Sequence, residues 1–239
     1  MARLADEAIC IRHWDWSETS QTVSLFGRSL GLVRGLAKGA KRERGRFGGG
    51  FDLLTRGEYL ALGKLDQGLL TLTDWTLLEG FPRLRSDLQA NRAAFYLADL
   101  LQRLMPPHDP HADAFDASVL ALRSLQAGVA PLEVAARFQW ALLESAGFAP
   151  RLEAPEGGGT LEFDSGEGCF REAMGTPGCW KVRRDTHEVL GAIAARSATM
   201  PDDPKPMERA ARLLAVHLRA ILGEEPYTMR LLMPGLPRR

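Results

Sequence analysis

The stretch LLTLTDWTL at residues 69–77 places Leu70 and Leu72 two positions apart, with Thr71 and Thr73 directly after each. This period of two, built from apolar and β-branched residues, predicts a strand with one buried face. Segments of similar pattern precede it at residues 8–13, 22–26, 30–37 and 57–63. The first part of the chain is therefore expected to form five short strands.

Five short strands within about 80 residues suit a small closed barrel, and the OB-fold is the five-stranded barrel of this size. Gly31, Gly35 and Gly39 interrupt the pattern and could supply the bends that barrel closure requires. We therefore expect an OB-fold domain over residues 1–80.

After Phe81 and Pro82 the apolar residues recur at helical spacing, as in Leu97, Leu101 and Leu104. Further helices are expected at residues 113–126, at 131–147 and from about 206 to 223. Residues 153–180 are rich in glycine and are interpreted as a loop or small excursion, in which 161–163 could form a short hairpin. Residues 224–239 are expected to fray.

The sequence thus predicts an α+β protein. An N-terminal five-stranded OB-fold barrel at residues 1–80 is followed by an all-helical domain at 81–239, with a Gly-rich excursion at about 151–185.

The composition is that of an ordinary globular protein, with 45% hydrophobic residues, 25% charged residues and a net charge of zero over 239 residues. It contains no apolar run long enough for a membrane span, and the N-terminus lacks the apolar core of a signal peptide. Three cysteines do not make a disulfide framework in a chain of this length. We expect a cytoplasmic protein.

The neutral total hides a local excess of positive charge between Arg28 and Arg46, where seven basic residues stand against the single acid Glu43. Capture of a polyanion depends on the local field, which decays over about 8–10 Å at physiological salt. The glycines Gly39 and Gly45 would let such a loop follow a phosphate backbone. The alternative interpretation is a solvated surface loop.

Aromatic side chains near this segment could stack on bases. Phe47 is the best candidate because it directly follows Arg46 instead of lying within a strand, and Phe51, Trp14 and Trp16 are the others. The alternative for each is a place in the barrel core.

No catalytic motif stands out in the sequence. Ser17, Glu18, Thr19 and Ser20 combine hydroxyls with a carboxylate, but a nucleophilic serine needs a base and an oxyanion site that no motif supplies. We interpret these residues as a turn held by hydrogen bonds from side chains to the backbone. There is also no phosphate-binding G-x-x-x-x-G-K-[ST] loop, and the protein is expected not to be an enzyme.

Several motifs resemble those of the bacterial RecO family. The segment WDWSETS at residues 14–20 matches that family's x-W/Y-S-E-T-S turn, and GLVRGLAKGAKR at 31–42 resembles its G-x-V-x-x-x-A-K-G-A-R-R strand and basic loop. RFGG at 46–49 and RFQWALLESAGF at 137–148 are similar to a following segment and to a helix of the family. The resemblance runs in order along nearly the whole chain.

The resemblance implies a mediator of recombinational repair that binds single- and double-stranded DNA and anneals complementary strands. It also implies docking to RecR and to the C-terminal tail of single-stranded-DNA-binding protein, and this docking helps RecA to load. It further implies that the protein associates with the nucleoid. With it, the basic segment becomes the predicted DNA-binding site, made of Arg34, Lys38, Lys41, Arg42, Arg44, Arg46 and Phe47.

Many members of that family carry two C-x-x-C pairs that would suit zinc. Here the first pair is absent near residues 153–157, and Glu172 stands where Cys169 would need its partner. Cys179 and His187 do not complete a set of four closely spaced ligands. We expect no zinc and no other cofactor.

For the acidic tail of single-stranded-DNA-binding protein, a docking site should combine a hydrophobic groove with cations. Arg137 is the candidate from the helical motif, and Arg123 is a candidate from the neighbouring helix. A surface salt bridge is the competing interpretation of each. An RNA-binding or translation-associated OB-fold protein is the alternative function, because OB barrels serve both polymers.

Overall fold

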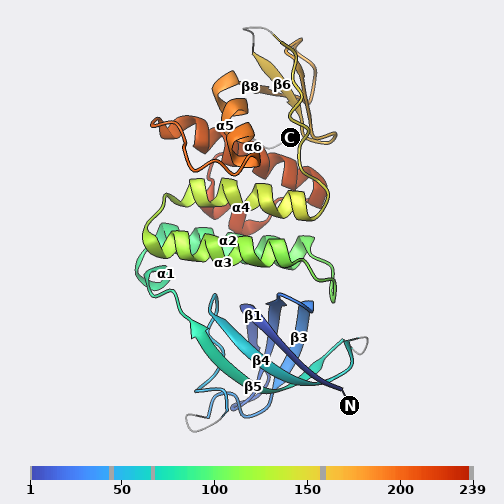
Figure 1. Ribbon diagram of the computed structural model, residues 1–239, viewed down its shortest axis with the longest axis vertical. Coiled ribbons are helices and arrows are strands. Elements are labelled where there is room, and N and C mark those ends of the chain that lie inside the picture. Colours follow the sequence, from blue (N-terminus) through green and yellow to red (C-terminus); the bar gives the residue numbers. More distant parts are fainter. Residues whose placement is uncertain (1, 43–45, 66–67, 157–159, 237–239) are drawn as a thin grey trace. The chain divides into compact units, whose positions relative to one another are not determined.

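The structure is a computed structural model that describes residues 2–42, 46–65, 68–156 and 160–236. Its first strands close into a barrel with the order β1-β2-β3-β5-β4 (Figure 1). All neighbours run antiparallel except β3 and β5, which are parallel. The barrel strands are β1 (Ala2–Asp15), β2 (Gln21–Gly27), β3 (Gly31–Ala37), β4 (Arg56–Gly63) and β5 (Leu70–Glu79). The predicted OB-fold barrel and its five strands are confirmed.

The barrel interior is filled by the alternate apolar residues that the period of two placed on one face. Val23 and Leu25 from β2 and Leu70 and Leu72 from β5 are all at most 3% exposed. Gly35 of β3 is required at its position, because a Cβ there would lie 2.6 Å from Cγ of Leu72.

A bulge in β1 decides which way the end of this strand faces. Cys10 pairs with Leu25 and points into the barrel, but the register shifts at Ile11, and Arg12 then pairs with Ser24 on the outer face. A bulge inserts one residue and so reverses the alternation that follows it. Arg12 and Trp14 therefore lie on the outside of the barrel.

The barrel continues into three helices, α1 (Arg83–Ser86), α2 (Leu88–Leu104) and α3 (Ala112–Ala127). The carboxylate of Asp87 caps α2 by accepting the N–H groups of Gln89 and Ala90. The ring of Phe115 in α3 packs against Phe26 on the outer face of β2, with centroids 6.3 Å apart. One end of the outer barrel face is thus covered by α3.

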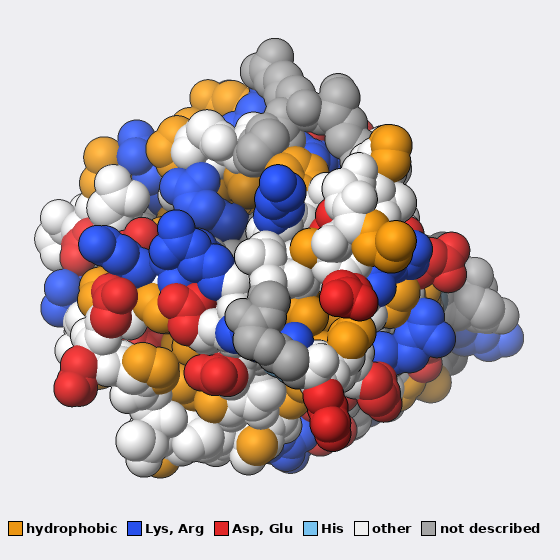
Figure 2. All heavy atoms as spheres, turned by 90° about the horizontal axis from the view of Figure 1, so that it is seen from above, with side chains coloured by type: hydrophobic (Ala, Val, Ile, Leu, Met, Phe, Trp, Pro, Cys, Tyr) orange, Lys and Arg blue, Asp and Glu red, His pale blue; other side chains and the backbone are white. Residues whose placement is uncertain are grey.

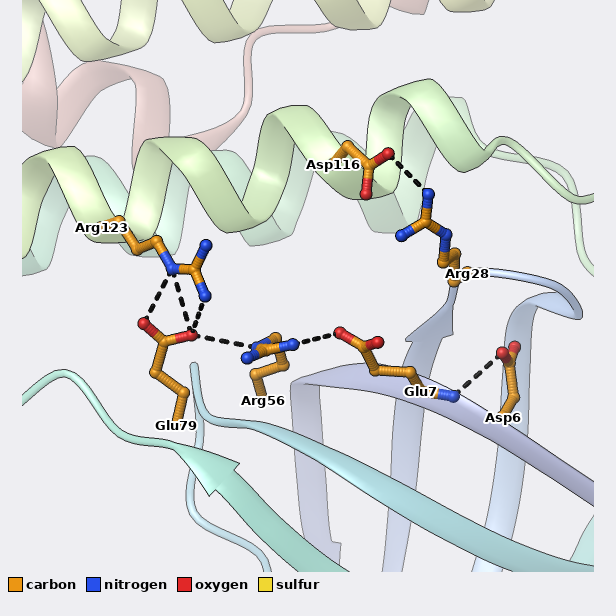
Figure 3. Close-up of polar contacts among 7 residues, drawn as sticks. All are labelled: Asp6, Glu7, Arg28, Arg56, Glu79, Asp116 and Arg123. Atoms are coloured by element: carbon orange, nitrogen blue, oxygen red, sulfur yellow. Dashed lines mark hydrogen bonds and ion pairs between the residues drawn. The ribbon is translucent and has the colours of Figure 1, made fainter.

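Ion pairs also join α3 to the barrel (Figure 3). Arg123 of α3 donates to both carboxylate oxygens of Glu79 at the end of β5, and Glu79 in turn accepts from Arg56 of β4 at 3.0 Å. Arg56 also pairs with Glu7 of β1. Nearby, Arg28 pairs with Asp116 of α3 at 2.9 Å.

Residues 128–236 form the second compact unit. A helical pair, α4 (Pro131–Ser145) and α6 (Pro204–Leu222), buries Leu142, Leu143 and Leu214. The other elements are β6 (Leu161–Asp164), β7 (Cys169–Glu172), β8 (Trp180–Val182), α5 (Arg184–Ala194) and α7 (Tyr227–Leu232). Among all the helices in the described ranges, none combines the length and apolar character needed to cross a bilayer.

Two predictions for this unit need correction. The Gly-rich segment is more than a loop with a hairpin, because β6 pairs with both β7 and β8 in a three-stranded antiparallel sheet. The C-terminal segment does not fray up to residue 236, because it contains α7 and buries Met229, Leu232 and Met233. The predicted helices at 113–126, at 131–147 and from about 206 correspond to α3, α4 and α6.

The two compact units divide at Ala127 and Gly128. Residues 80 and 81 mark the change from strands to helices, but α1, α2 and α3 belong to the same compact unit as the barrel. The domain boundary at residue 80 therefore stays a prediction.

Candidate nucleic-acid interface

The basic loop follows β3 and comprises residues 38–50, of which 38–42 and 46–50 are described. Lys38, Arg42 and Arg46 are exposed on it, and Arg34 is exposed on β3 just before it. The predicted site residue Arg44 lies outside the described residues. Four of the predicted cations are therefore solvent-facing and belong to one strand and the loop that continues it.

The basic loop is held at both of its ends by three successive residues. These are Thr19 and Ser20, which precede β2, and Gln21, its first residue. Ser20 Oγ accepts the N–H of Gly39 at 3.2 Å, and the carbonyl of Thr19 accepts the N–H of Lys41 at 3.0 Å. At the far end, Gln21 Oε1 accepts the N–H of Phe51 at 3.0 Å. Because Ser20 and Gln21 are buried, these bonds fix the loop to the barrel wall.

The basic loop is also anchored by apolar side chains. Ala40 is fully buried, and Phe47 is only 6% exposed, with its ring centroid 5.6 Å from that of Phe51 in the barrel core. This corrects the choice of Phe47 as a base-stacking residue. Its ring belongs to the same buried cluster as Phe51 and Trp75.

The pairing of the cations separates them into two kinds. Lys41 Nζ lies 2.7 Å from Oδ2 of Asp15 at the end of β1, so it contributes to loop anchoring. Within the described ranges, no carboxylate pairs with the remaining predicted cations, which are Arg34, Lys38, Arg42 and Arg46. Among the described residues their charge is therefore uncompensated, and a polyanion is the ligand that such a group of cations attracts.

The outer face of β1–β3 continues this positive region. Arg12 and Arg34 are both cross-strand neighbours of Ser24, one from each side, and both are exposed. The guanidinium carbon of Arg12 lies 5.0 Å from the ring centroid of Trp14. Sequence reasoning missed Arg12; its spacing of two from Trp14 on a strand was the available signal.

The turn between β1 and β2 has the role that the sequence predicts. Ser17 Oγ accepts the N–H of Ser20 at 3.2 Å, and the carbonyl of Ser20 accepts the N–H of Trp16 at 2.9 Å. The turn is therefore held by bonds from a side chain and the backbone, and this prediction is confirmed.

The two predicted partner-binding arginines both form salt bridges. Arg137 of α4 donates from Nε to Glu133 at 3.1 Å and from a terminal nitrogen to the carbonyl of Ser197 at 3.2 Å. Arg123 is engaged by Glu79, which raises the pKa of the guanidinium. Arg123 belongs to the first compact unit and Arg137 to the second.

Two of the side chains considered for zinc, those of Cys169 and His187, each contact another group. Sγ of Cys169 lies 3.5 Å from the cationic guanidinium of Arg171, and Nε2 of His187 lies 2.8 Å from the carbonyl of Leu152. In the described part of the chain, no three His, Cys, Asp or Glu side chains are grouped so that they could hold a metal ion. A structural zinc needs four such donors without a competing cation among them.

Cations also occur away from the barrel, where acids accompany them. Figure 2 shows a face on which Lys and Arg side chains gather beside Asp and Glu. In the second compact unit, Arg171 pairs with Asp164 and Arg209 pairs with Asp185. These two pairs compensate the charges of Arg171 and Arg209.

Comparisons with known proteins give matches over most of the chain. Residues 1–81 match the family described as "Recombination protein O N terminal", and residues 85–192 match "Recombination protein O C terminal". The chain is similar to the DNA repair protein RecO of Anaeromyxobacter sp. (strain K), with 31% identity over 97% of this chain and 96% of that protein. It is also similar to the DNA repair protein RecO of Salinibacter ruber, with 30% identity over 98% of this chain and 82% of that protein.

Proposed function

Because the chain belongs to the RecO family of DNA repair proteins, we propose that it binds single- and double-stranded DNA through the basic loop and anneals complementary strands. Together with RecR it helps RecA to load onto DNA covered by single-stranded-DNA-binding protein. It acts by binding, without a catalytic step and without a cofactor.

This proposal rests on the exposure of four cations and on their lack of a carboxylate partner among the described residues. Arg34, Lys38, Arg42 and Arg46 are exposed and have no carboxylate partner among the described residues. The loop that bears three of them is fastened at both ends to buried residues of the barrel. Charges on the held, described parts of the loop lose less conformational freedom on binding, which lowers the cost of binding.

Phosphate binding by such cations has a measurable signature. Each lysine or arginine that neutralises a phosphate releases a condensed counterion, so affinity falls as salt rises. The slope of log K against log salt is about 0.9 per contact on duplex DNA and about 0.7 on single strands. Four contacts would therefore give a slope near 3 on single strands.

The test is a variant in which these four cations, Arg34, Lys38, Arg42 and Arg46, are changed to Gln. We expect its affinity for an oligonucleotide of thymidines to fall steeply at low salt and its salt slope to drop by about 3. Binding is measured by fluorescence anisotropy at several salt concentrations. Strand annealing is measured in parallel and should fall with the affinity.

A charge-matched control changes four exposed cations of the second compact unit to Gln, namely Lys181, Arg183, Arg196 and Lys205. This control alters the net charge equally and should retain most of the binding and annealing. Wild-type behaviour of the loop variant would refute the proposed site. A large preference for RNA over DNA of the same sequence, at matched salt, would refute the proposed function.

Docking of the acidic tail of single-stranded-DNA-binding protein is assigned in this proposal to Arg137, since Arg123 is held in the contact between barrel and α3. Arg137 is half-buried and also pairs with Glu133, so a tail carboxylate must compete with that acid. We expect Arg137→Ala to weaken binding of the tail peptide and Glu133→Gln to strengthen it, as measured by calorimetry. Unchanged affinity in both variants would contradict this docking site.

A further inference from the structure

The outer face of β1–β3 carries exposed aromatic rings next to the basic loop, and the DNA-binding site as proposed above does not use them. Trp16, in the turn after β1, is 66% exposed, and Trp14 is 39% exposed. Large aromatic side chains are normally buried, so two neighbouring exposed indoles are a costly arrangement in a free protein.

The chain segment that carries these indoles is held next to the basic loop. Asp15 stands between Trp14 and Trp16 in the chain, and its carboxylate binds Lys41 Nζ of the basic loop at 2.7 Å. The backbone N–H of Lys41 is in turn bonded to the carbonyl of Thr19. The segment that carries the rings is therefore joined to the segment that carries the charges by two separate bonds.

A stacked pair already exists on this face. The bulge at Ile11 turns Arg12 and Trp14 outward, and the Arg12 guanidinium lies over the indole of Trp14. Arg34 lies in the same cross-strand row as Arg12, beyond the small side chain of Ser24. Planar guanidinium groups and indoles are the two surfaces on which unpaired bases stack.

We propose that this face selects single-stranded over duplex DNA, with one base stacking on Trp16 and another on the Arg12–Trp14 pair. The proposal rests on the DNA-binding function proposed above and adds the recognition of bases to that of phosphates. Bases in a duplex are stacked on each other and offer no free ring face, whereas those of a single strand do.

The test separates bases from phosphates by using three probes of equal length. These are a strand of thymidines, the same strand with abasic sites throughout, and a duplex. For Trp16→Ala and Trp14→Ala we expect about tenfold weaker binding of the thymidine strand, equal to about 1.4 kcal/mol each, with the salt slope unchanged. Binding of the abasic strand and of the duplex should stay at the wild-type level.

Tyr227→Ala is the matched control. Tyr227 is 64% exposed, and the guanidinium carbon of Arg230 lies 5.6 Å from its ring centroid, so it reproduces the exposed ring and its stacked arginine in the other compact unit. This variant should bind all three probes as wild type does. Trp16→Phe, which keeps a ring, should recover part of the affinity that Trp16→Ala loses.

A second readout does not depend on replacing a side chain by Ala. Trp75 and Trp140 are buried, so Trp14 and Trp16 are the two most exposed tryptophans of the described residues. Addition of the thymidine strand should quench the intrinsic fluorescence of the wild-type protein, and the abasic strand should not. Trp16→Phe should show a smaller quench.

The outcomes distinguish this inference from the proposed function. If the wild-type protein binds the abasic strand as tightly as the thymidine strand, and both Trp variants match it, stacking is refuted while salt-dependent DNA binding stands. If none of the probes binds in a salt-dependent manner, the proposed function itself fails. Loss of affinity for the duplex in the Trp variants would also overturn the single-strand preference.

Discussion

The arginines of the barrel fall into two groups that differ in what their guanidinium groups contact. At the end of the barrel that faces α3, Arg28 and Arg56 each pair with a carboxylate, as Arg123 does from α3 itself. Around the basic loop, Arg34 and Arg42 have no acidic partner among the residues that the structure describes. Both groups consist of arginines, and they differ in whether a carboxylate lies within ion-pair distance.

This difference explains how a protein of zero net charge can hold a site for a polyanion. A paired arginine is already neutralised and stabilises the contact between two elements, whereas an unpaired one keeps a local field that reaches about 8–10 Å at physiological salt. Acids such as Glu7 and Glu79 form ion pairs with arginine at the end of the barrel that faces α3. Ion pairing therefore decides where uncompensated positive charge remains on the surface. The net charge of the chain does not show this distribution.

The largest effect is expected for Arg56→Leu, which removes a bridging cation on the paired side. Arg56 is mostly buried and contacts both Glu7 and Glu79, so its loss leaves the partly buried Glu7 without its ion pair and Glu79 with Arg123 alone. We expect the free energy of unfolding to fall by about 2 kcal/mol, between the values for exposed and buried pairs. Urea denaturation measures it, and the salt slope of DNA binding should not change.

Arg85→Leu is the control for that experiment, because the salt bridge from Arg85 to Asp52 is highly exposed on both sides. Its loss should cost less than about 1 kcal/mol. Equal losses in the two variants would mean that the paired arginines contribute nothing beyond surface charge.

A somewhat smaller effect is expected on the unpaired side, for the double variant Lys38→Gln with Arg42→Gln. Loss of two phosphate contacts should lower the salt slope on single strands by about 1.4 and weaken binding about tenfold at physiological salt. The counterpart is Arg28→Gln with Arg123→Gln, which removes the same charge from paired positions. If both double variants lowered the slope equally, the distinction between paired and unpaired cations would be wrong.

Much of the first compact unit could be predicted from the sequence, because hydrophobic periodicity reports which face of a strand or helix is buried. The start of β1 was missed: residues 8–13 were predicted, and the strand spans Ala2–Asp15. Its polar beginning and the bulge at Ile11 both break the alternation. In the second unit, β6, β7 and β8 are too short, at three or four residues, to show a period.

The small sheet was also hard to predict because it buries polar side chains. Glu162 of β6 is 1% exposed and accepts the N–H of Gly175 at 2.6 Å and that of Thr176. An acid in a Gly-rich segment indicates a loop, and only the folded backbone provides the donors that make its burial acceptable.

The sequence predicted the exposed charges of the candidate site, but among the aromatic candidates it favoured the buried Phe47 over the exposed Trp14 and Trp16. A run of cations is visible in one dimension, and Lys38 and Arg42 are exposed as expected. Whether a ring next to such a run faces water depends on the space left in the core. Phe47 fills that space, and Trp16 is left outside.

Ser20→Ala tests how the order of the basic loop affects DNA binding without changing any charge. This variant removes the acceptor that holds Gly39 at the start of the basic loop. We expect about 1 kcal/mol less stability and about threefold weaker DNA binding with an unchanged salt slope, because the same cations are present on a less ordered loop. Thr73→Val, which removes a hydroxyl bonded to the carbonyl of Leu60 on the barrel, should leave DNA binding unaltered.

The smallest expected effect concerns pH on the paired side. The hydrogen bond from Arg123 is the main cause that holds the pKa of Glu79 below its ordinary value of 4.5. Because the folded pKa is lowered, the stabilisation by ionised Glu79 is fully present above the ordinary value and is lost as the pH falls through the lowered one.

The difference in melting temperature between wild type and Glu79→Gln should therefore be constant at neutral pH. It should shrink once the pH drops below the ordinary pKa of a glutamate. Asp87, whose pKa is held low mainly by the N–H of Ala90, titrates in both proteins, so its contribution cancels in the difference. A difference that stayed constant down to about pH 3 would show that Glu79 contributes through packing alone. DNA binding at neutral pH should be the same in both proteins, since neither side of the Glu79–Arg123 pair belongs to the basic loop.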